Sequence, residues 1–415
     1  MRRKKAARPQ RLAGLFVLLL LTAIAGVGLW FFLRPVAPGE LRLVRAGFSA
    51  LPGWSTSDAR PALAAFRRSC AVVLRLAPDR PMGGTGYAGE AGDWRSACSA
   101  GPPAVLDAKG ARSWFETWFV PFELHQRSGG RALFTGYYEP EIYASRIRRG
   151  VYQTPVYGLP DDLATADLGL FRPELSGLRI TGRVVDHRLV PFPTRAEIDA
   201  DGMGDATVLL YASDPISVFF LHIQGSGRAR FDDGAMIRLA YAGQNGRPDT
   251  LIGRTLIAQS DVDRQHMSMQ AIREWLESHS GAARKMMESD QSYVFFRELP
   301  IGAPNLGSPG SEGVPLTPEA SIAVDHAFHA LGVPMFVATE APAASPTLPA
   351  TRFARLCIAQ DTGGAIKGSL RADIFWGFGA QAESVAGRMK SRGDLYVLLP
   401  KPLAGRLPAR FLETS

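Results

Sequence analysis

Three hydrophobic patterns follow one another along the chain. Residues 12–33 form one uninterrupted run without charge, LAGLFVLLLLTAIAGVGLWFFL. Residues 59–119 place apolar side chains at helical spacing, which predicts helices over 59–76, around Trp94 and over 111–119. From residue 132 onward, apolar and polar residues alternate between turns rich in glycine, proline, asparagine and aspartate. The pattern predicts a mainly β protein that begins with a few helices.

The first predicted helix has its apolar residues on one side, which is the pattern of a helix that faces a core. The next two helices are rich in aromatic residues. Side chains of this kind at helical spacing are more often core than ligand-binding, although a sugar groove is the alternative. The residues concerned are Leu63, Phe66, Cys70 and Val73 in the first helix, and Trp94, Trp114, Phe115, Trp118 and Phe119 in the others.

The β region is interrupted by helical signals in two places. Thr194 and Glu197 have the spacing of a capping box, which predicts a helix start. Residues 265–291 are amphipathic with a break at Ser280 and Gly281, and we expect this region to connect two domains. Strands are expected in the segments between, at 178–192, 206–214, 216–231 and 235–243, and again from residue 293 onward.

Length and charge limit the function classes. A chain of 415 residues with 46% hydrophobic composition can form two or three domains. Of the net charge of +8, seven units belong to basic residues among the first 34 positions, where there is no acid, so the remainder carries only +1. A nearly neutral globular part lacks the basic surface that nucleic-acid binding needs, and we expect no nucleic-acid partner.

The apolar run at residues 12–33 is long enough to cross a bilayer as one helix. The basic residues before it should remain cytoplasmic, which sends the rest of the chain across the membrane into the periplasm. Ala23 and Ala25 offer a cleavage site, but the apolar run continues beyond them, so the pattern favours an uncleaved anchor in the inner membrane over a cleaved export signal. No cysteine lies in or just after the run, which excludes a lipoprotein on the bacterial pattern.

Export changes the interpretation of the three cysteines, because thiols outside the cytoplasm meet an oxidising compartment. Cys70 and Cys98 are a candidate disulfide pair, with two separate buried thiols as the alternative. Cys357 remains, and we interpret it as a small core residue, since no histidine is recognisably placed to activate it as a nucleophile.

Candidate chemistry is most concentrated in residues 357–379, CIAQDTGGAIKGSLRADIFWGFG. The apolar residues before Asp361 predict a buried strand that ends at this acid, in a Thr-Gly-Gly turn. A second strand is predicted from Arg371 to Phe375, with Arg371, Asp373 and Phe375 on one face. Two acids therefore lie among strands and glycines, and Asp325 in SIAVDH is a third acid at the end of a predicted strand.

These three aspartates resemble the 3D domain, which is named for such a set. Together with other stretches in the same order, they make the chain similar to the membrane-bound lytic murein transglycosylase A family over about residues 94–400. The supporting stretches are Gly136-Tyr137-Tyr138-Glu139-Pro140, Phe220-Leu221-His222-Ile223-Gln224-Gly225-Ser226-Gly227, Tyr241-Ala242-Gly243-Gln244-Asn245-Gly246, Ser292-Tyr293-Val294-Phe295-Phe296 and Leu316-Thr317-Pro318.

The resemblance implies a mainly β fold with a double-psi β-barrel, formed by residues 39–135 and 292–415, and an inserted second β domain, residues 136–291. A groove between the two domains would hold a peptidoglycan strand. Within the barrel, residues 316–400 would contain the three aspartates.

The resemblance also implies a reaction and a site. The enzyme would cleave the bond between N-acetylmuramic acid and N-acetylglucosamine without water, leaving a 1,6-anhydro end. Asp373 would act as the single acid and base, and Asp361 and Asp325 would orient the site and tune it. For this role the pKa of Asp373 must be raised, and we expect Arg371 to pair with another carboxylate. The expected substrate-binding residues are Gly136, Tyr137, Tyr138, Glu139, Gln224, Gly225, Ser226, Gly227 and Lys367.

The chain departs from the family pattern at two places. His222 stands where relatives commonly have glutamine, which would alter a substrate contact. After Asp325, His326 to His329 replace the usual proline and isoleucine, and the lost proline would loosen the turn that orients the acid. Because the histidines are scattered, we expect no metal site, and no cofactor is implied.

Three alternatives remain at this stage. The single Asp-Thr-Gly at residue 361 resembles half of an aspartic protease site, which would require a homodimer. A glycan hydrolase would use two carboxylates. A scaffold would bind peptidoglycan without cleaving it. Beyond glycan strands and the membrane, cell-wall synthesis or division proteins are the expected partners, and the protein is expected to be a monomer.

Overall fold

The computed structural model of the protein describes residues 41–101, 107–126, 129–175, 177–203, 208–259, 261–263 and 267–412. The predicted membrane anchor at residues 12–33 lies outside these residues. Across the described ranges, no helix has both the length and the apolar character needed to cross a bilayer. The chain from Leu41 to Ser415 forms one compact unit.

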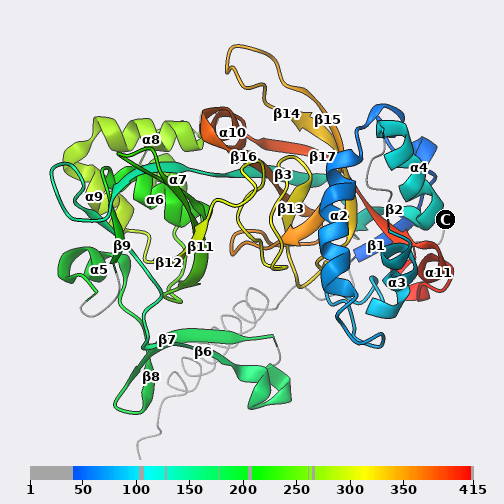
Figure 1. Cartoon of the computed structure of the whole chain (residues 1–415), viewed down its shortest axis with the longest axis horizontal. Coiled ribbons are helices and arrows are strands. Elements are labelled where there is room, and N and C mark those ends of the chain that lie inside the picture. The colour runs from blue at the N-terminus through cyan, green and yellow to red at the C-terminus, as the bar shows by residue number, and fades with distance from the viewer. Residues whose placement is uncertain are drawn as a thin grey trace, which may run out of the picture. The chain divides into compact units, whose positions relative to one another are not determined.

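Six strands of this unit close into a barrel. The ring runs β17, β14, β15, β13, β16, β3 and back to β17, and β1 and β2 extend the sheet from β17 (Figure 1). Neighbours are antiparallel except for two parallel pairs, β13 with β15 and β16 with β3. The strands are β1 (Leu41–Arg45), β2 (Phe119–Gln126), β3 (Ala132–Glu139), β13 (Ser321–Val324), β14 (Pro334–Ala341), β15 (Thr351–Asp361), β16 (Arg371–Phe378) and β17 (Lys390–Pro400).

A second sheet has six strands in the order β12, β11, β10, β4, β9, β5, and a smaller one has the order β6, β7, β8. The chain leaves the barrel after Glu139 and comes back to it after Pro300, since β3 still belongs to the barrel and β12 to the second sheet. Both transitions therefore come later than the expected boundaries at 135 and 292. The strands are β4 (Glu141–Ser145), β5 (Thr154–Tyr157), β6 (Leu163–Asp167), β7 (Arg179–Val185), β8 (Arg188–Val190), β9 (Val208–Ala212), β10 (Gly227–Phe231), β11 (Met236–Gln244) and β12 (Val294–Pro300).

The three helices before the barrel are present as predicted: α2 (Arg60–Val73), α3 (Ala91–Ala100) and α4 (Ala108–Trp118). Their apolar side chains pack into the barrel core together with β13 to β17. The aromatic residues of this region are buried or partly buried against that core, so they stabilise the fold and do not line a sugar groove. These residues are Trp94, Trp114, Phe115, Trp118 and Phe119.

The cysteines follow their sequence-based assignment. Cys70 in α2 and Cys98 in α3 form a disulfide, with their Cα atoms 5.1 Å apart. Cys357 is a free thiol, completely buried in β15, and burial raises its pKa. The disulfide therefore fixes α2 against α3, and Cys357 is part of the core.

Two helical regions that follow residue 190 were predicted from the sequence, and one helix was mistaken for a strand. The capping box is formed at α5 (Arg195–Asp201), where Thr194 and Glu197 bond to each other's backbone. The amphipathic region forms α8 (Met269–Ser278) and α9 (Ser280–Glu288). The break lies at His279, and the expected break residues Ser280 and Gly281 instead begin α9. The remaining helices are α6 (Pro215–Gln224), α7 (Ile252–Ala258), α10 (Gly379–Ala386) and α11 (Lys401–Ala404).

The segment 216–231 was expected to be a strand, and this prediction is wrong for its first part, which is helix α6. Asp214 caps the helix by accepting hydrogen bonds from the backbone of Ile216 and Ser217, and Pro215 occupies the first helical position. Gly225, in the left-handed conformation, ends the helix. The apolar run alone does not distinguish a buried helix from a buried strand, whereas the Asp-Pro cap does.

Candidate active site

Two of the predicted acids lie in one row of the barrel sheet. Asp361, at the end of β15, and Asp373, in β16, both pair with Ala323 of β13, which lies between them. Thr135 of β3 pairs with Asp373 on its other side. Paired residues point to the same face of a sheet, and neighbouring strands lie about 4.8 Å apart, so about 10 Å separates the two aspartate Cα atoms. Strand pairing therefore places both acids and a threonine at one site.

Asp373 is half-buried, and its Oδ1 accepts a hydrogen bond from Thr135 Oγ1 at 2.5 Å. Burial has the largest effect and raises the pKa of Asp373 to about 6. The Thr135 hydrogen bond and the Arg371 charge lower this pKa, and the Asp361 charge raises it. Among the described residues, Oδ2 has no hydrogen-bond partner. This oxygen is therefore available to exchange a proton with a ligand.

Arg371 does not pair with a carboxylate, contrary to expectation: no ion pair within the described ranges includes it. Its Nη1 donates to the carbonyl of Ala372 at 2.8 Å, and its Nη2 donates to Thr135 Oγ1 at 2.6 Å. Thr135 thus accepts from the arginine while it donates to Asp373. The arginine acts on the acid partly through this hydroxyl, whose proton it directs toward Asp373.

Asp361 has many more donors than Asp373. Its Oδ1 accepts hydrogen bonds from the backbone and the hydroxyl of Ser311 and from the backbone of Thr362, each at 2.9 Å. Its Oδ2 accepts one from the Tyr137 hydroxyl at 2.9 Å. Burial raises the pKa of Asp361, and these donors lower it. Burial has the larger effect, so the pKa of Asp361 lies above its ordinary value, and with both oxygens occupied the carboxyl group is held in a fixed position near Asp373.

Asp325 is buried directly after β13, and its carboxylate accepts hydrogen bonds from backbone N–H groups. Its Oδ1 accepts from Ala327 N at 3.1 Å, and its Oδ2 accepts from Gly368 N at 2.8 Å. Gly368 belongs to the loop that joins the strands of the other two aspartates, so Asp325 fixes that loop. The neighbouring Lys367 is exposed, and no ion pair in the described part of the chain involves it.

The turn after Asp325 is held by backbone hydrogen bonds, with His326 where the family resemblance led us to expect proline. Phe328 N and His329 N both donate to the Asp325 carbonyl at 3.0 Å. His329 is completely buried between Tyr87, whose hydroxyl lies 2.7 Å from Nδ1, and the carbonyl of Ser369, 2.8 Å from Nε2. Burial lowers the pKa of His329 to about 4. This histidine therefore supports the loop that follows Asp325.

The stretch from Gly136 to Glu139 places one side chain at the acids. Tyr137 bonds to Asp361, and its ring lies 5.2 Å from that of Phe375. Gly136 is packed so closely that an added Cβ would come within 2.6 Å of Trp376. The Tyr138 ring is buried against α10. Gly136 and Tyr138 thus serve packing, which does not support the expected direct substrate contact.

Glu139 was also expected to bind substrate, but it is completely buried. Its Oε2 accepts from Arg228 Nε at 2.9 Å, and its Oε1 accepts from Ser308 N and lies 3.7 Å from Arg238 Nε. Because Glu139 ends a barrel strand and the arginines come from β10 and β11, this ion cluster connects the two sheets. Glu139 is therefore a structural residue at their junction.

The Gln-Gly-Ser-Gly stretch begins at the C-terminus of α6. The amide oxygen of Gln224 accepts a hydrogen bond from Tyr138 N at 3.0 Å, which links the second sheet region to the barrel strand. Gly227 is needed for packing, since a Cβ there would come within 2.7 Å of the Pro140 carbonyl. Ser226 is half-buried. Gly225 and Ser226 remain the members of this stretch with the freedom to meet a ligand.

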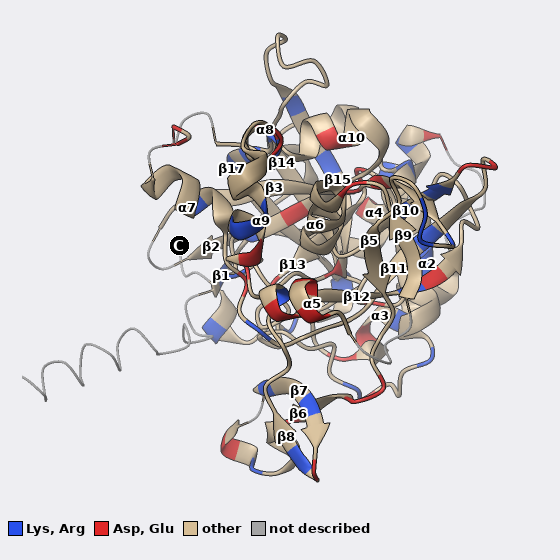
Figure 2. Cartoon of the chain, turned by 90° about the vertical axis from the view of Figure 1, so that its left-hand side faces the viewer, with Lys and Arg blue, Asp and Glu red and all other residues tan. Residues whose placement is uncertain are grey.

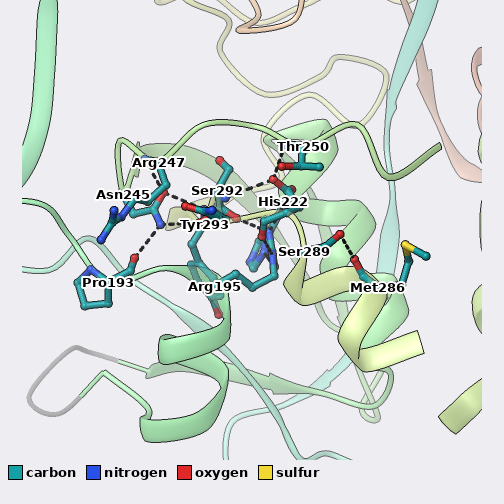
Figure 3. Close-up of polar contacts among 12 residues, drawn as sticks. Pro193, Arg195, His222, Asn245, Arg247, Thr250, Met286, Ser289, Ser292 and Tyr293 are labelled. Carbon is teal, nitrogen blue, oxygen red and sulfur yellow. Dashed lines mark hydrogen bonds and ion pairs between the residues drawn. The ribbon is translucent and has the colours of Figure 1, made fainter. Parts of the chain in front are cut away.

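Three stretches that carry the family resemblance, those around His222, Asn245 and Tyr293, meet in a buried polar network in the inserted region (Figure 3). Arg195 donates to His222 Nδ1 at 2.8 Å and to the Ser292 carbonyl at 2.6 Å. The Asn245 side chain accepts from Tyr293 N at 3.0 Å. Since His222 is only 5% exposed, its departure from the family pattern does not alter a substrate contact, contrary to expectation.

Charged side chains of both signs are mixed over the folded unit. Lys and Arg residues are interspersed with Asp and Glu in the view of Figure 2, as the small net charge of the globular part predicts. In the ranges that the structure describes, no group of three or more His, Cys, Asp or Glu side chains is arranged to hold a metal ion.

Sequence reasoning missed two contributors to the site. Thr135 lies two residues before Tyr137, and the period of two in a strand places both on one face, which was an available signal. Ser311 lies in a Pro/Gly-rich loop far from Asp361 in the sequence. No local pattern connects these two residues, so only the fold reveals their contact.

Comparisons with known proteins agree with this architecture. Residues 133–297 match the MltA specific insert domain, and residues 320–399 match the 3D domain. Membrane-bound lytic murein transglycosylase A of Escherichia coli K12 is 34% identical over 280 residues, which cover 67% of this chain and 68% of that protein. The protein of the same name from Vibrio cholerae is 33% identical over 274 residues, which cover 65% and 66%.

Solved structures resemble the whole folded unit. A membrane-bound lytic murein transglycosylase from Agrobacterium tumefaciens superposes with a TM-score of 0.76 at 32% identity, covering 88% of this chain and 100% of that one. MltA from Neisseria gonorrhoeae gives 0.69 at 30% identity, covering 88% and 93%. E. coli MltA with bound chitohexaose gives 0.62 at 26% identity, covering 88% and 97%. The chain therefore belongs to the membrane-bound lytic murein transglycosylase A family and is a lytic transglycosylase.

Proposed function

We propose that Asp373 is the single acid and base with which this enzyme cleaves the β-1,4 bond between N-acetylmuramic acid and N-acetylglucosamine in peptidoglycan. One observation carries the proposal: Asp373 has a pKa of about 6, and its Oδ2 is free of hydrogen bonds from the described residues. Such a carboxyl group retains part of its population in the protonated form near neutral pH, as a general acid must.

The reaction needs two proton transfers at this one group. Protonated Asp373 gives its proton to the glycosidic oxygen as the bond from C1 of the muramoyl residue to that oxygen breaks. The resulting carboxylate then takes the proton of the C6 hydroxyl of the same sugar, while the C6 oxygen bonds to C1. The product is a 1,6-anhydro ring, and the enzyme regains its proton. A nucleophile tethered within the sugar has a large effective molarity, so no activated water is needed.

The other two acids would support Asp373. Asp361 is held by four hydrogen bonds, and its charge raises the pKa of Asp373. Asp325 would keep the loop of residues 362–370 in place. A hydrolase that uses two carboxylates is less consistent with this arrangement, because a second catalytic carboxylate must be free to reach water or C1. Both oxygens of Asp361 are occupied.

The glycan would lie between the barrel and the inserted sheet. In this arrangement Tyr137 and Lys367 come from the barrel, and Gly225 and Ser226 from the end of α6. One relative supports a glycan ligand, since the E. coli MltA structure holds bound chitohexaose. The two parallel strand pairs are consistent with a double-psi barrel, which we propose as the topology of the closed ring.

We place the folded unit in the periplasm, anchored in the inner membrane by residues 12–33. Two observations support this location. Several relatives are described as membrane-bound, and the Cys70–Cys98 disulfide is of the kind that persists in an oxidising compartment.

Digestion of purified peptidoglycan sacculi tests the proposed reaction, with the soluble products analysed by mass. Muropeptides with 1,6-anhydro ends are expected, and each is lighter than the hydrolysed product by one water. Reducing ends would instead identify a hydrolase. Absence of any soluble product would favour a binding protein.

A further inference from the structure

A carboxyl group outside the proposed mechanism lies one residue from a hydrogen-bond donor of Asp361. Glu312 is half-buried in the turn of residues 308–316, between β12 and β13. No ion pair among the described residues includes it. Burial raises the pKa of Glu312 to about 7, which shows that its surroundings do not favour the charged form. Burying a carboxyl group costs free energy, so we ask what the contacts of Glu312 contribute to the structure.

The Glu312 side chain attaches the turn to helix α2. Ser69 Oγ of this helix donates to Glu312 Oε2 at 2.6 Å. Gly332 makes room for the carboxyl group, since a Cβ at that position would come within 2.8 Å of Oε1. The backbone N of Glu312 also donates to the carbonyl of Gln360 at 3.0 Å. The residue is thus held by α2 on one side and by β15 on the other.

The helix that receives Glu312 is itself well anchored. Ser69 precedes Cys70, whose disulfide joins α2 to α3. Gln360 Nε2 donates to Ser69 Oγ at 2.9 Å, so the serine is oriented by the residue next to Asp361. Arg68 binds the same turn a second time, through the carbonyl of Pro315 at 3.2 Å. Helix α2 therefore fixes the turn at two points.

This turn also fixes Asp361. Ser311 donates both its backbone N–H and its hydroxyl to Asp361 Oδ1, each at 2.9 Å. These two hydrogen bonds lower the pKa of Asp361, and the charge they preserve raises the pKa of Asp373. A displacement of the turn would remove both donors at once.

We propose that Glu312 is a positioning residue, which holds the turn of residues 308–316 against α2 so that Ser311 keeps Asp361 in place beside Asp373. The inference rests on the proposed function of Asp373. Glu312 does not touch the substrate in this arrangement. It acts through Ser311 and Asp361.

The test compares Glu312→Ala, Glu312→Gln and Glu319→Ala in the full-length enzyme. Glu319 is an exposed acid seven positions away and serves as the matched control. Glu312→Ala should lower kcat on sacculi about tenfold with little change in KM, because a positioning defect affects the reacting geometry more than binding. The alkaline limb of its pH profile should move to lower pH, since a less ionised Asp361 raises the pKa of Asp373 less. Glu312→Gln, which can still accept from Ser69, should restore most of the activity.

Hydrogen exchange gives a second readout that does not depend on catalysis. The amide of Ser311 should exchange faster in Glu312→Ala than in the wild type, and at the wild-type rate in Glu319→Ala. If Glu312→Ala does not fold, Ser69→Ala removes the same hydrogen bond and should show the same changes. Wild-type exchange at Ser311 together with a wild-type pH profile would overturn the inference. Failure of the proposed function would appear differently, as an absence of anhydro products from the wild-type enzyme.

Discussion

Asp361 and Asp373 flank Ala323 in one row of the barrel sheet, and their hydrogen bonds differ sharply. Asp361 accepts four hydrogen bonds, whereas Asp373 accepts one, from Thr135. Donors favour the charged form of a carboxyl group, and a nearby negative charge favours the neutral form of its neighbour. The pair therefore separates into one acid whose two oxygens are both held by donors and one that keeps an oxygen free to carry a proton.

Replacing Asp373 by asparagine should abolish the release of anhydro-muropeptides. The amide has nearly the same shape and can still accept from Thr135, but it cannot transfer a proton. We expect kcat to fall about a thousandfold, since general acid–base catalysis usually contributes roughly 10²–10⁴, with glycan binding retained. Mass analysis of sacculus digests measures the loss. Asp79→Asn, at an exposed acid, is the control, and near-full activity of Asp373→Asn would remove Asp373 from its role.

Removing the Thr135 hydroxyl should move the pH profile upward. Thr135→Val keeps the shape of the side chain but deletes a hydrogen bond that lowers the pKa of Asp373. A general acid must be protonated, so activity declines above its pKa. The alkaline limb should shift by about one pH unit to higher pH, since hydrogen bonds to charged groups are worth about 1.5–3 kcal/mol. Thr135→Ser retains the hydroxyl and should behave like the wild type, and an unchanged limb in Thr135→Val would contradict the assignment.

The Asp361→Asn variant should shift the same limb in the opposite direction. The Asp361 charge raises the pKa of Asp373, so its removal should lower that pKa and move the alkaline limb to lower pH. Rates measured from below to above the pKa of about 6, with the wild type and the two variants, give both shifts in one experiment. A shift of Asp361→Asn to higher pH would show that the two acids do not interact as described.

Much of this site could be predicted from the sequence because the apolar and polar pattern within each strand is enough to identify it. The apolar run before Asp361 and the alternation around Asp373 correctly indicated β15 and β16, and the disulfide and the capping box at Thr194 were also confirmed. These features depend on residues close in sequence or on chemistry that is independent of the fold.

The remainder depends on tertiary contacts. The contact between Ser311 and Asp361 joins a loop to a strand end, and Glu139 proved to be buried because two arginines from another sheet reach it. Helix α6 was mistaken for a strand because a short apolar run has no period that separates the two structures. Burial and pairing between distant segments decide the first two cases, and neither is visible in a single sequence. For α6 the Asp214-Pro215 cap was a local signal that the apolar run obscured.

The disulfide between Cys70 and Cys98 should stabilise the folded unit by about 3 kcal/mol, as expected for a crosslink that closes a loop of this size. Their sequence separation is 28 residues. The double variant Cys70→Ala, Cys98→Ala should therefore unfold at lower denaturant concentration. A reductant should destabilise the wild type to a similar extent and leave the variant unchanged. Equal unfolding midpoints for oxidised and reduced wild type would show that the crosslink contributes nothing.

Asp373→Asn should also make the protein more stable, in a pH-dependent way. The pKa of Asp373 is about 6 in the folded protein, above its ordinary value of 3.8. The folded state therefore binds the proton more tightly than the unfolded state, and stability contributed by protonated Asp373 is lost as the pH rises from about 4 through 6. A neutral asparagine does not suffer this loss.

The gain in the free energy of unfolding of Asp373→Asn over the wild type should be absent near pH 4 and reach at most about 3 kcal/mol above pH 7. Each unit of pKa difference corresponds to about 1.4 kcal/mol. Denaturant unfolding at about pH 4, 6 and 8 gives the free energy of unfolding of the wild type and of Asp373→Asn. The difference between the two proteins is then compared across pH values, so that any pH-independent effect of the substitution cancels. A difference that is constant with pH would mean that Asp373 ionises in the folded enzyme as readily as in the unfolded chain, and such a group would hold too little of the proton near neutral pH to act as the acid.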